Sequence, residues 1–184
     1  MNTLGGGDIS WMLQAGFSQK EILQYHYPTE HEIERANIRI TFLGYFWKDW
    51  SLIGNGNYSA LRGLDVRDDH PAEMGEYVGV TALDEDWTPM NQMIKYLKYG
   101  FGRTTDYVNE DIRNGRLTRE EAISLVNMFD GKCSEKYIST FCEFIGITAE
   151  KFWQVIDTHG VNKSLFHKIH LGKYEPKFKV GHGL

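Results

Sequence analysis

The chain lacks most features that mark membrane, secreted or nucleic-acid-binding proteins. It has only two cysteines, and Cys133 and Cys142 are nine positions apart, the spacing of neither a zinc knuckle nor a redox pair. No long apolar run, signal peptide or lipidation motif is present, so we expect a soluble cytoplasmic protein with no membrane span. The formal net charge of −5 argues against a general nucleic-acid binder.

The residues that are abundant favour a folded domain. Apolar residues make up 41% of the 184 positions and aromatic residues 14%. A chain of this length and composition can bury a core without disulfides or metals. We therefore expect both cysteines to be reduced, with Cys142 as a small core residue.

The first third predicts short helices and one strand. The runs SQKE from residue 18 and TEHE from residue 29 match the capping box, so we expect helices that extend through Tyr25 and Ala36. Residues 38–46 have the pattern of a strand that completes a parallel sheet. Ligands of such sheets bind at the carboxyl ends of strands, here residues 44–50. Alternatively, Trp47 and Trp50 only cover the sheet edge.

Residues 51–88 are rich in Gly, Asn and Asp and predict loops, where binding groups are common. Asp68 and Asp69 either form a turn or, with neighbouring Arg and His residues, hold a sugar or Mg²⁺. Asp84 and Asp86, close before Trp87, are a second candidate sugar or Mg²⁺ site. The alternative is that they only oppose the dipole of a helix that starts at Thr88.

Residues 93–121 join a lysine-bearing amphipathic helix to a Gly-Phe-Gly-Arg turn and a charge-striped helix. Gly100 and Gly102 allow a sharp turn that exposes amides near Arg103, and such a turn suits a phosphate or carboxylate. The alternative is a solvated face of intrahelical ion pairs. The candidate phosphate- and substrate-binding residues are Lys95, Lys98, Gly100, Gly102, Arg103 and Asp106.

The final third predicts a helical bundle and a basic segment. Thr118, Ser134 and Thr148 are expected N-caps, and glycines follow the expected helices. A helix-turn-helix DNA reader is the alternative for this region, but residues 118–160 hold four basic and seven acidic residues. After Gly160 five lysines face one glutamate, which suggests a basic tail that docks on an acidic partner or a sugar-phosphate lipid, or is a solvated extension. His167 and His170 are three residues apart and could make half of a metal site, but no thiol or acidic partner is near in sequence, so we expect no metal site there.

Several motifs follow one another along about residues 35–160: FLGYF at 42–46, ALDED at 82–86, KYLKYGFGRTTD at 95–106, EDIRNGRLTREEAI at 110–123, DGKCSEKYISTFCEFIGI at 130–147 and FW at 152–153. In this order and spacing they resemble the C-terminal half of the N-acetyl sugar amidotransferases of bacterial surface-polysaccharide synthesis. Members of this family resemble PP-loop ATP pyrophosphatases, whose nucleotide loop lies upstream of the matched region. The run LGGGDIS at 4–10 is similar to that loop, but Leu4 and Ile9 replace its two hydroxyl residues. We therefore expect the chain to begin downstream of the ATP site.

The resemblance implies an α/β fold that is mostly helical in this chain. Residues 1–103 would be a remnant of a doubly wound sheet of the PP-loop type, similar to adenine-nucleotide α-hydrolases. Residues 104–160 would form a helical bundle and 161–184 the basic C-terminal tail.

The resemblance also implies a reaction in lipopolysaccharide or O-antigen biosynthesis. ATP with Mg²⁺ would activate the acetamido group of a nucleotide-linked sugar, and ammonia would convert it to an acetamidino group. Lys95, Lys98 and Arg103 would contact phosphates and Asp106 would orient Arg103. Tyr107 stands where the family commonly has histidine, which weakens a proton-transfer role there and leaves the catalytic residue unidentified.

The implied partners are a glutaminase, an ammonia-channelling synthase-like subunit and a separate PP-loop polypeptide. A non-catalytic interaction module, or an inactive remnant of the family, is the alternative function.

Overall fold

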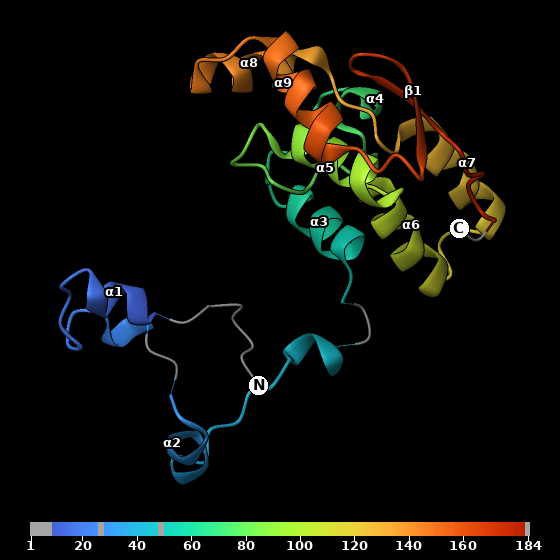
Figure 1. Ribbon diagram of the computed structural model, residues 1–184. Coiled ribbons are helices and arrows are strands. Elements are labelled where there is room, and N and C mark those ends of the chain that lie inside the picture. The colour runs from blue at the N-terminus through green and yellow to red at the C-terminus, as the bar shows by residue number, and fades with distance from the viewer. Residues whose placement is uncertain (1–8, 26–27, 48–49, 183–184) are drawn as a thin grey trace. The chain divides into compact units, whose positions relative to one another are not determined.

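The computed structural model describes residues 9–25, 28–47 and 50–182, and the chain divides into two units, Met1–Lys48 and Asp49–Leu184. Figure 1 shows the elements of each unit. The boundaries that the sequence suggests, near residues 103 and 160, both fall inside the second unit. Gly5, Gly6 and Asp8 of the glycine-rich run lie outside the described residues.

The first unit contains short helical elements. Thr29 and Glu32 form the expected capping box at the start of α2. Ser18 and Glu21 also exchange hydrogen bonds, but a short 3-10 helix follows them in place of an α-helix. The elements of this unit are α1 (Ser10–Gln14), η1 (Leu23–Tyr25), α2 (Glu30–Arg35) and η2 (Leu43–Tyr45).

The strand expected over residues 38–46 does not form. A strand needs a partner for its backbone N–H and C=O groups, whereas here the Tyr45 and Phe46 N–H groups donate to the C=O groups of Phe42 and Leu43. This local pairing produces η2. Within the described residues the only sheet has two strands and lies near the C-terminus, so the predicted parallel sheet is not present there. The fold is mostly helical.

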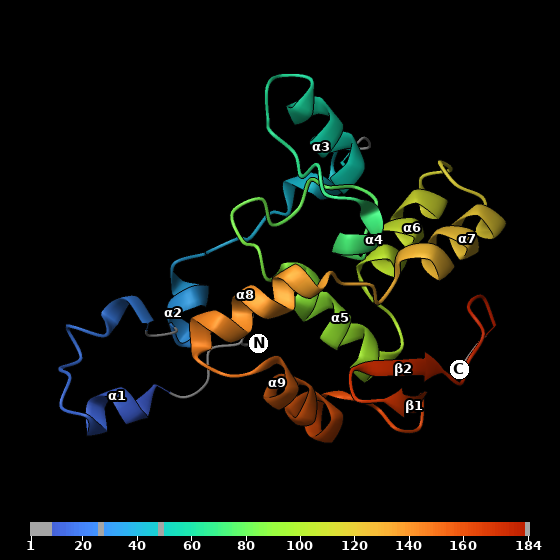
Figure 2. The same cartoon turned by 90° about the horizontal axis from the view of Figure 1, so that it is seen from above.

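The second unit is built around helix α5, as the two views in Figure 1 and Figure 2 show. The buried side chains Met90, Met93 and Leu97 of α5 pack against α8, α9, η3 and strand β1. A smaller core joins α6 to α7 through Val108 and Val126. The elements are α3 (Leu52–Ala60), α4 (Pro71–Met74), α5 (Thr88–Tyr99), α6 (Arg103–Arg113), α7 (Arg119–Phe129), α8 (Glu135–Ile145), α9 (Ala149–Val155), the π-helix η3 (Ile156–Gly160), β1 (Phe166–His170) and β2 (Lys173–Pro176).

Local capping signals fix where these helices begin and end. Thr118 opens α7 with a complete capping box, and the side chains of Ser134 and Thr148 cap α8 and α9. Gly100 ends α5 in the left-handed conformation, which glycine adopts without steric cost. The expected N-caps of the final third are therefore confirmed. No helix in the described part of the chain combines the length and apolar content needed to cross a membrane.

The basic segment after Gly160 is not a solvated extension. β1 and β2 pair antiparallel, and Phe166 on β1 is 3% exposed. Its ring lies 5.1 Å from the ring of Tyr96 on α5 and 5.7 Å from that of Phe178. The lysines of this segment suggest an exposed tail. The segment instead packs on α5, because burying its aromatic side chains removes large apolar surfaces from water.

Candidate functional site

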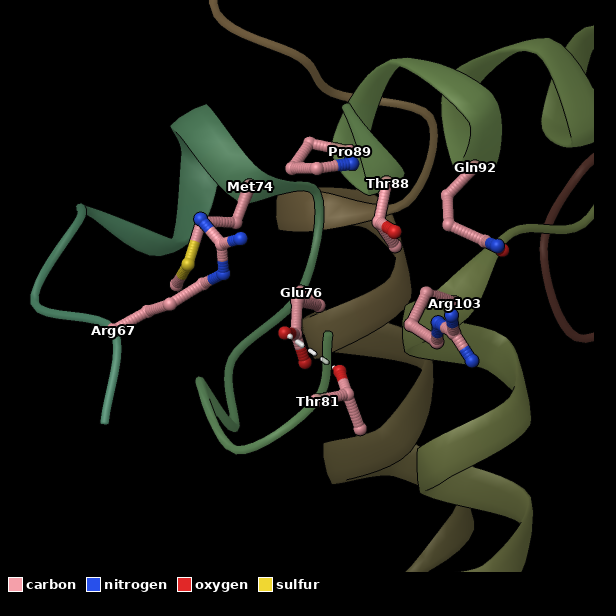
Figure 3. Close-up of a pocket in the computed structure, with 8 residues that line it drawn as sticks. All are labelled: Arg67, Met74, Glu76, Thr81, Thr88, Pro89, Gln92 and Arg103. Carbon is pink, nitrogen blue, oxygen red and sulfur yellow. Dashed lines mark hydrogen bonds between the residues drawn. The ribbon is translucent and has the colours of Figure 1, made fainter. Parts of the chain in front are cut away.

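A cavity lies among α4, the loop after it, and the first turns of α5 and α6. Figure 3 shows the side chains that line it. Met74 and Pro89 provide apolar surface, and both are buried. Arg103 enters from the first turn of α6, and Arg67 lies on the opposite side. The segment around α4 and the first turns of α5 and α6 therefore build one site.

Three unpaired polar atoms face this cavity. Among the residues that the structure describes, the buried side-chain nitrogen and oxygen atoms without a hydrogen-bond partner are Glu76 Oε2, Gln92 Oε1 and Arg103 Nε, and all three residues line the same cavity. Buried polar groups are nearly always paired, because an unpaired one costs about 1–3 kcal/mol. Their convergence places around one cavity three polar atoms that need a partner, from bound water or from a ligand.

Glu76 is the deepest charged group of the cavity, with 6% of its surface exposed. The Thr81 hydroxyl donates to its Oε1 at 3.3 Å, and the same hydroxyl lies 2.6 Å from that of Tyr107. Burial raises the pKa of the Glu76 carboxyl, against the opposing effect of backbone N–H groups and the Arg103 charge. Burial likewise raises the pKa of Tyr107 to about 12, so Tyr107 is a neutral hydrogen-bonding group near neutral pH.

The cavity is narrow. The cavity and its mouth enclose about 250 Å³ of empty space. The centre of a water molecule can occupy only about 10 Å³ of that space. That interior space corresponds to about one water molecule. Two acceptors and one donor face it, so the arrangement suits a neutral group that both donates and accepts hydrogen bonds.

The Gly-Phe-Gly turn has a structural partner of its own. The Gly102 N–H donates to Asp130 Oδ2 at 2.8 Å, and the Thr105 hydroxyl donates to the same oxygen at 2.7 Å. A Cβ at residue 102 would lie 2.7 Å from Asp130 Oδ1. Gly100 packs against Leu165 and Phe178. The Gly102 amide, which the sequence suggests as a phosphate contact, thus already donates a hydrogen bond to a carboxylate of the same chain.

Lys95, Lys98 and Arg103, the cations near this turn, do not lie in one site. Lys95 Nζ forms a 2.5 Å ion pair with Asp106 Oδ2 and lies 4.6 Å from the centre of the Phe101 ring. Asp106 therefore pairs with Lys95 rather than with Arg103. Lys98 is exposed. Of these three cations, Arg103 alone lines the cavity.

Asp84 and Asp86 are exposed and line a shallow hollow with Trp87 and Thr140. Asp86 also lines a neighbouring hollow and accepts a 3.3 Å hydrogen bond from Arg67. Among the described residues, no group of three or more His, Cys, Asp or Glu side chains could hold a metal ion.

Asp69 lies in the second of these hollows, which we call the Asp69–Asp86 groove; its lining residues are Asp69, Asp86, Lys136, Tyr137 and Thr140. The Lys136 ammonium pairs with Asp69, and the Tyr137 hydroxyl donates to it at 2.8 Å. These two bonds keep the pKa of the Asp69 carboxyl below its usual value. Arg67 lies 3.9 Å from Asp69 and also lines the cavity, so the groove and the cavity are neighbours.

Sequence patterns missed the most informative groups of the site. Glu76 follows Gly75 in a segment without periodicity, and Gln92 is one polar residue on an amphipathic helix. Asp130 stands between a helix end and Gly131, which is typical of a turn. That Glu76 and Gln92 line one cavity with Arg103 is evident only from the folded structure.

One family model matches the chain. It is described as LPS biosynthesis protein WbpG-like, C-terminal domain, and it covers residues 72–179, a range that includes Glu76, Gln92, Arg103 and Asp130. A search of curated proteins finds no significant match. Since the family model spans more than half of the 184 residues, the chain belongs to the family of LPS biosynthesis proteins that carry a WbpG-like C-terminal domain.

Proposed function

We propose that this chain is the substrate-binding, C-terminal portion of an ATP-dependent N-acetyl sugar amidotransferase. The enzyme would convert the acetamido group of a nucleotide-linked sugar to an acetamidino group for lipopolysaccharide or O-antigen synthesis. Family membership supports the biosynthetic context, and the sequence motifs support the reaction.

The observation that carries the proposal is the convergence of Glu76, Gln92 and Arg103. Their unpaired atoms face a cavity inside the region that matches the family. Each of these buried polar atoms destabilises the fold unless a bound water molecule or a ligand pairs with it. A binding site gains from them, because the ligand supplies the missing hydrogen bonds.

Two features that would hold ATP and Mg²⁺ have no free groups among the described residues. The Gly102 amide, at the start of a helix where phosphates bind well, is bonded to Asp130, and the described carboxylates form no metal-binding group. We therefore assign activation of the acetamido oxygen to a separate PP-loop polypeptide. Ammonia would come from a glutaminase through a channel-forming synthase-like subunit.

The role of this chain is then to hold the sugar nucleotide. Lys98 is exposed and Lys95 is partly exposed, so both can approach the diphosphate, whose charge favours cations. The uncharged sugar end would lie at the mouth of the cavity. Fixing the substrate in this way lowers the entropic cost of the reaction that the partner performs.

Calorimetry on the purified chain tests the proposal. We expect UDP-N-acetylglucosamine to bind and ATP not to bind, and we expect Lys98→Ala to weaken sugar-nucleotide binding. Lys151→Ala is the matched control, because Lys151 is also exposed but lies on α9. The proposal is wrong if the sugar nucleotide fails to bind, or if both lysine variants weaken it equally.

A further inference from the structure

Two exposed aromatic rings lie next to each other at the C-terminal end of α5. The rings of Tyr99 and Phe101 have centres 6.2 Å apart and are tilted by 38°. Tyr99 is 56% exposed and Phe101 is 40% exposed. Single exposed apolar residues are common on protein surfaces, but two adjacent rings offer faces and edges against which a ligand ring can stack. The pair is therefore a candidate platform for an aromatic group.

Two lysines lie beside this aromatic pair. Lys95 Nζ is 4.6 Å from the centre of the Phe101 ring, and its 2.5 Å ion pair with Asp106 holds it there. Lys98 directly precedes Tyr99 and is exposed. The surface thus combines aromatic rings with cations, and we call Lys95, Lys98, Tyr99 and Phe101 the aromatic–lysine surface.

The basic C-terminal segment adds positive charge at this end of α5. The Asn162 N–H donates to the Leu97 C=O at 2.9 Å, which places the start of the segment beside the last turn of the helix. Lys163 follows Asn162, and its C=O accepts a 2.6 Å hydrogen bond from Lys177 Nζ. Both lysines are exposed. Because charges act over about 10 Å at 0.1 M salt, this end of the helix favours an anionic ligand.

One face of α5 leads from these rings to the cavity. Gln92, Lys95 and Tyr99 are at positions i, i+3 and i+7, which share a helix face. Gln92 lines the cavity, and Tyr99 lies two helical turns further on, about 10 Å along the axis. A ligand that lies along α5 can therefore have one end at the cavity mouth and the other on Tyr99.

We propose that Tyr99 and Phe101 bind the base of the nucleotide-linked sugar, while Lys95 and Lys98 contact its diphosphate and the sugar lies at the mouth of the cavity. This inference rests on the proposed function and adds the residues that bind the nucleoside. The order of groups along the ligand matches the order of groups along the helix face. Because the Lys95 ammonium lies against Phe101, Tyr99 is the main stacking partner and Phe101 borders the base.

This placement leaves the reacting group accessible. The sugar lies outside the narrow cavity, so its acetamido carbonyl remains open to a separate polypeptide and to ammonia. The base and the diphosphate anchor the ligand at the far end of the helix face. This chain would then hold the substrate by its nucleotide and present the sugar to its partner.

The aromatic–lysine surface suits a sugar nucleotide better than a sugar phosphate or ATP. A sugar phosphate has no ring that could stack on Tyr99. ATP brings Mg²⁺ with its triphosphate, and the described carboxylates form no metal-binding group. Stacking on an aromatic side chain depends little on which base is present, because every base has a π-face.

Calorimetry with UDP-N-acetylglucosamine tests the assignment. Tyr99→Leu keeps an apolar side chain but removes the ring, so we expect binding to weaken about tenfold, within the usual range for one base stacked on an aromatic side chain. Tyr99→Phe keeps the ring and should retain most of the affinity. Tyr58→Leu is the matched control, because Tyr58 is 60% exposed but lies on α3. It should bind as the wild type does.

Saturation-transfer NMR identifies the part of the ligand that contacts the protein. We expect the uracil ring protons to receive strong saturation from the wild type. In Tyr99→Leu this signal should fall relative to that of the N-acetyl methyl group. Circular dichroism spectra of all variants must match that of the wild type.

Each other outcome rejects the assignment. If the sugar nucleotide binds but Tyr99→Leu keeps the wild-type affinity, the base lies elsewhere and the proposed function stands. Equal losses in Tyr99→Leu and Tyr58→Leu, or a Tyr99→Phe variant as weak as Tyr99→Leu, would show that stacking on this ring does not hold the base. If the wild type binds no sugar nucleotide, the proposed function and this inference fail together.

Discussion

The Gly102 N–H donates a 2.8 Å hydrogen bond to Oδ2 of Asp130 at the start of α6. The Thr105 hydroxyl and N–H donate to the same carboxylate. An acidic group is favourable at this end of a helix, because its unpaired N–H groups and dipole are positive. Asp130 thus connects the end of α7 to the start of α6 and fixes the turn from which Arg103 reaches the cavity.

Replacing Asp130 by alanine should destabilise the fold. Burial raises the pKa of this carboxyl, and its removal leaves buried donors of Gly102 and Thr105 unpaired. We expect the free energy of unfolding to fall by about 1–3 kcal/mol, measured by urea unfolding. Asp130→Asn keeps one oxygen acceptor and should lose less. Equal stability of the alanine variant and the wild type would contradict this role.

Two glycines with nearly equal backbone angles provide a matched pair. Gly131 and Gly115 have φ of +73° and +69°, so alanine at either position costs about 1–2 kcal/mol of backbone strain. A Cβ at Gly131 would also overlap the Tyr96 ring, whereas one at Gly115 meets nothing within 4 Å. We expect Gly131→Ala to be more destabilising than Gly115→Ala in urea unfolding. Equal losses would show that the Tyr96 contact is unimportant.

Short-range patterns predicted much of this fold. Thr118 and Glu121 are three residues apart and form the expected capping box, because all the atoms involved lie in one helical turn. Gly100 ends α5 as expected for the same reason. Such signals need no knowledge of distant residues.

The features that sequence patterns did not predict depend on contacts between residues far apart in the chain. Gly102 and Asp130 are 28 residues apart, so nothing in the Gly-Phe-Gly motif shows that its amide already has a partner. The expected strand at residues 38–46 needs a neighbouring strand, and its own residues bond locally. The cavity could not be predicted, because neither Glu76 nor Gln92 has a sequence pattern that places it beside Arg103.

The C-terminal hairpin should contribute to stability. Phe166 is 3% exposed, whereas Ile169 on the same strand is 50% exposed. We expect Phe166→Ala to lower the free energy of unfolding by about 3–5 kcal/mol, as is typical of buried aromatic residues, and Ile169→Ala to have a small effect. Denaturant unfolding of both variants checks this. Similar values for the two would place the hairpin outside the core.

Asp106 should weaken the binding of an anionic ligand by neutralising Lys95, with which it forms an ion pair. Under the proposed function, Asp106→Asn frees Lys95 for the diphosphate. Because partly exposed pairs are worth little, we expect only about a two- to fivefold gain in affinity for UDP-N-acetylglucosamine. The gain should shrink with added salt. An unchanged or weaker affinity would exclude Lys95 from the phosphate-binding surface.

Glu76 should make the stability depend on pH. Its pKa is raised above the ordinary value of 4.5, chiefly by burial, so the folded state holds this proton at pH values where the unfolded state has lost it. The free energy of unfolding therefore decreases as the pH rises from 4.5 through the raised pKa. The carboxyl of Asp130 is shifted in the same direction and adds to this slope.

Glu76→Gln removes one titrating group and keeps the size of the side chain. We expect urea unfolding at a series of pH values to show a smaller decrease above pH 4.5 for this variant than for the wild type, with the residual slope due to Asp130. A matched control is Glu150→Gln, because Glu150 is exposed on α9. If Glu76→Gln has the slope of the wild type, Glu76 titrates in the fold as it does in the unfolded chain. The carboxylate would then be solvated, and the cavity would not isolate its unpaired oxygen from water.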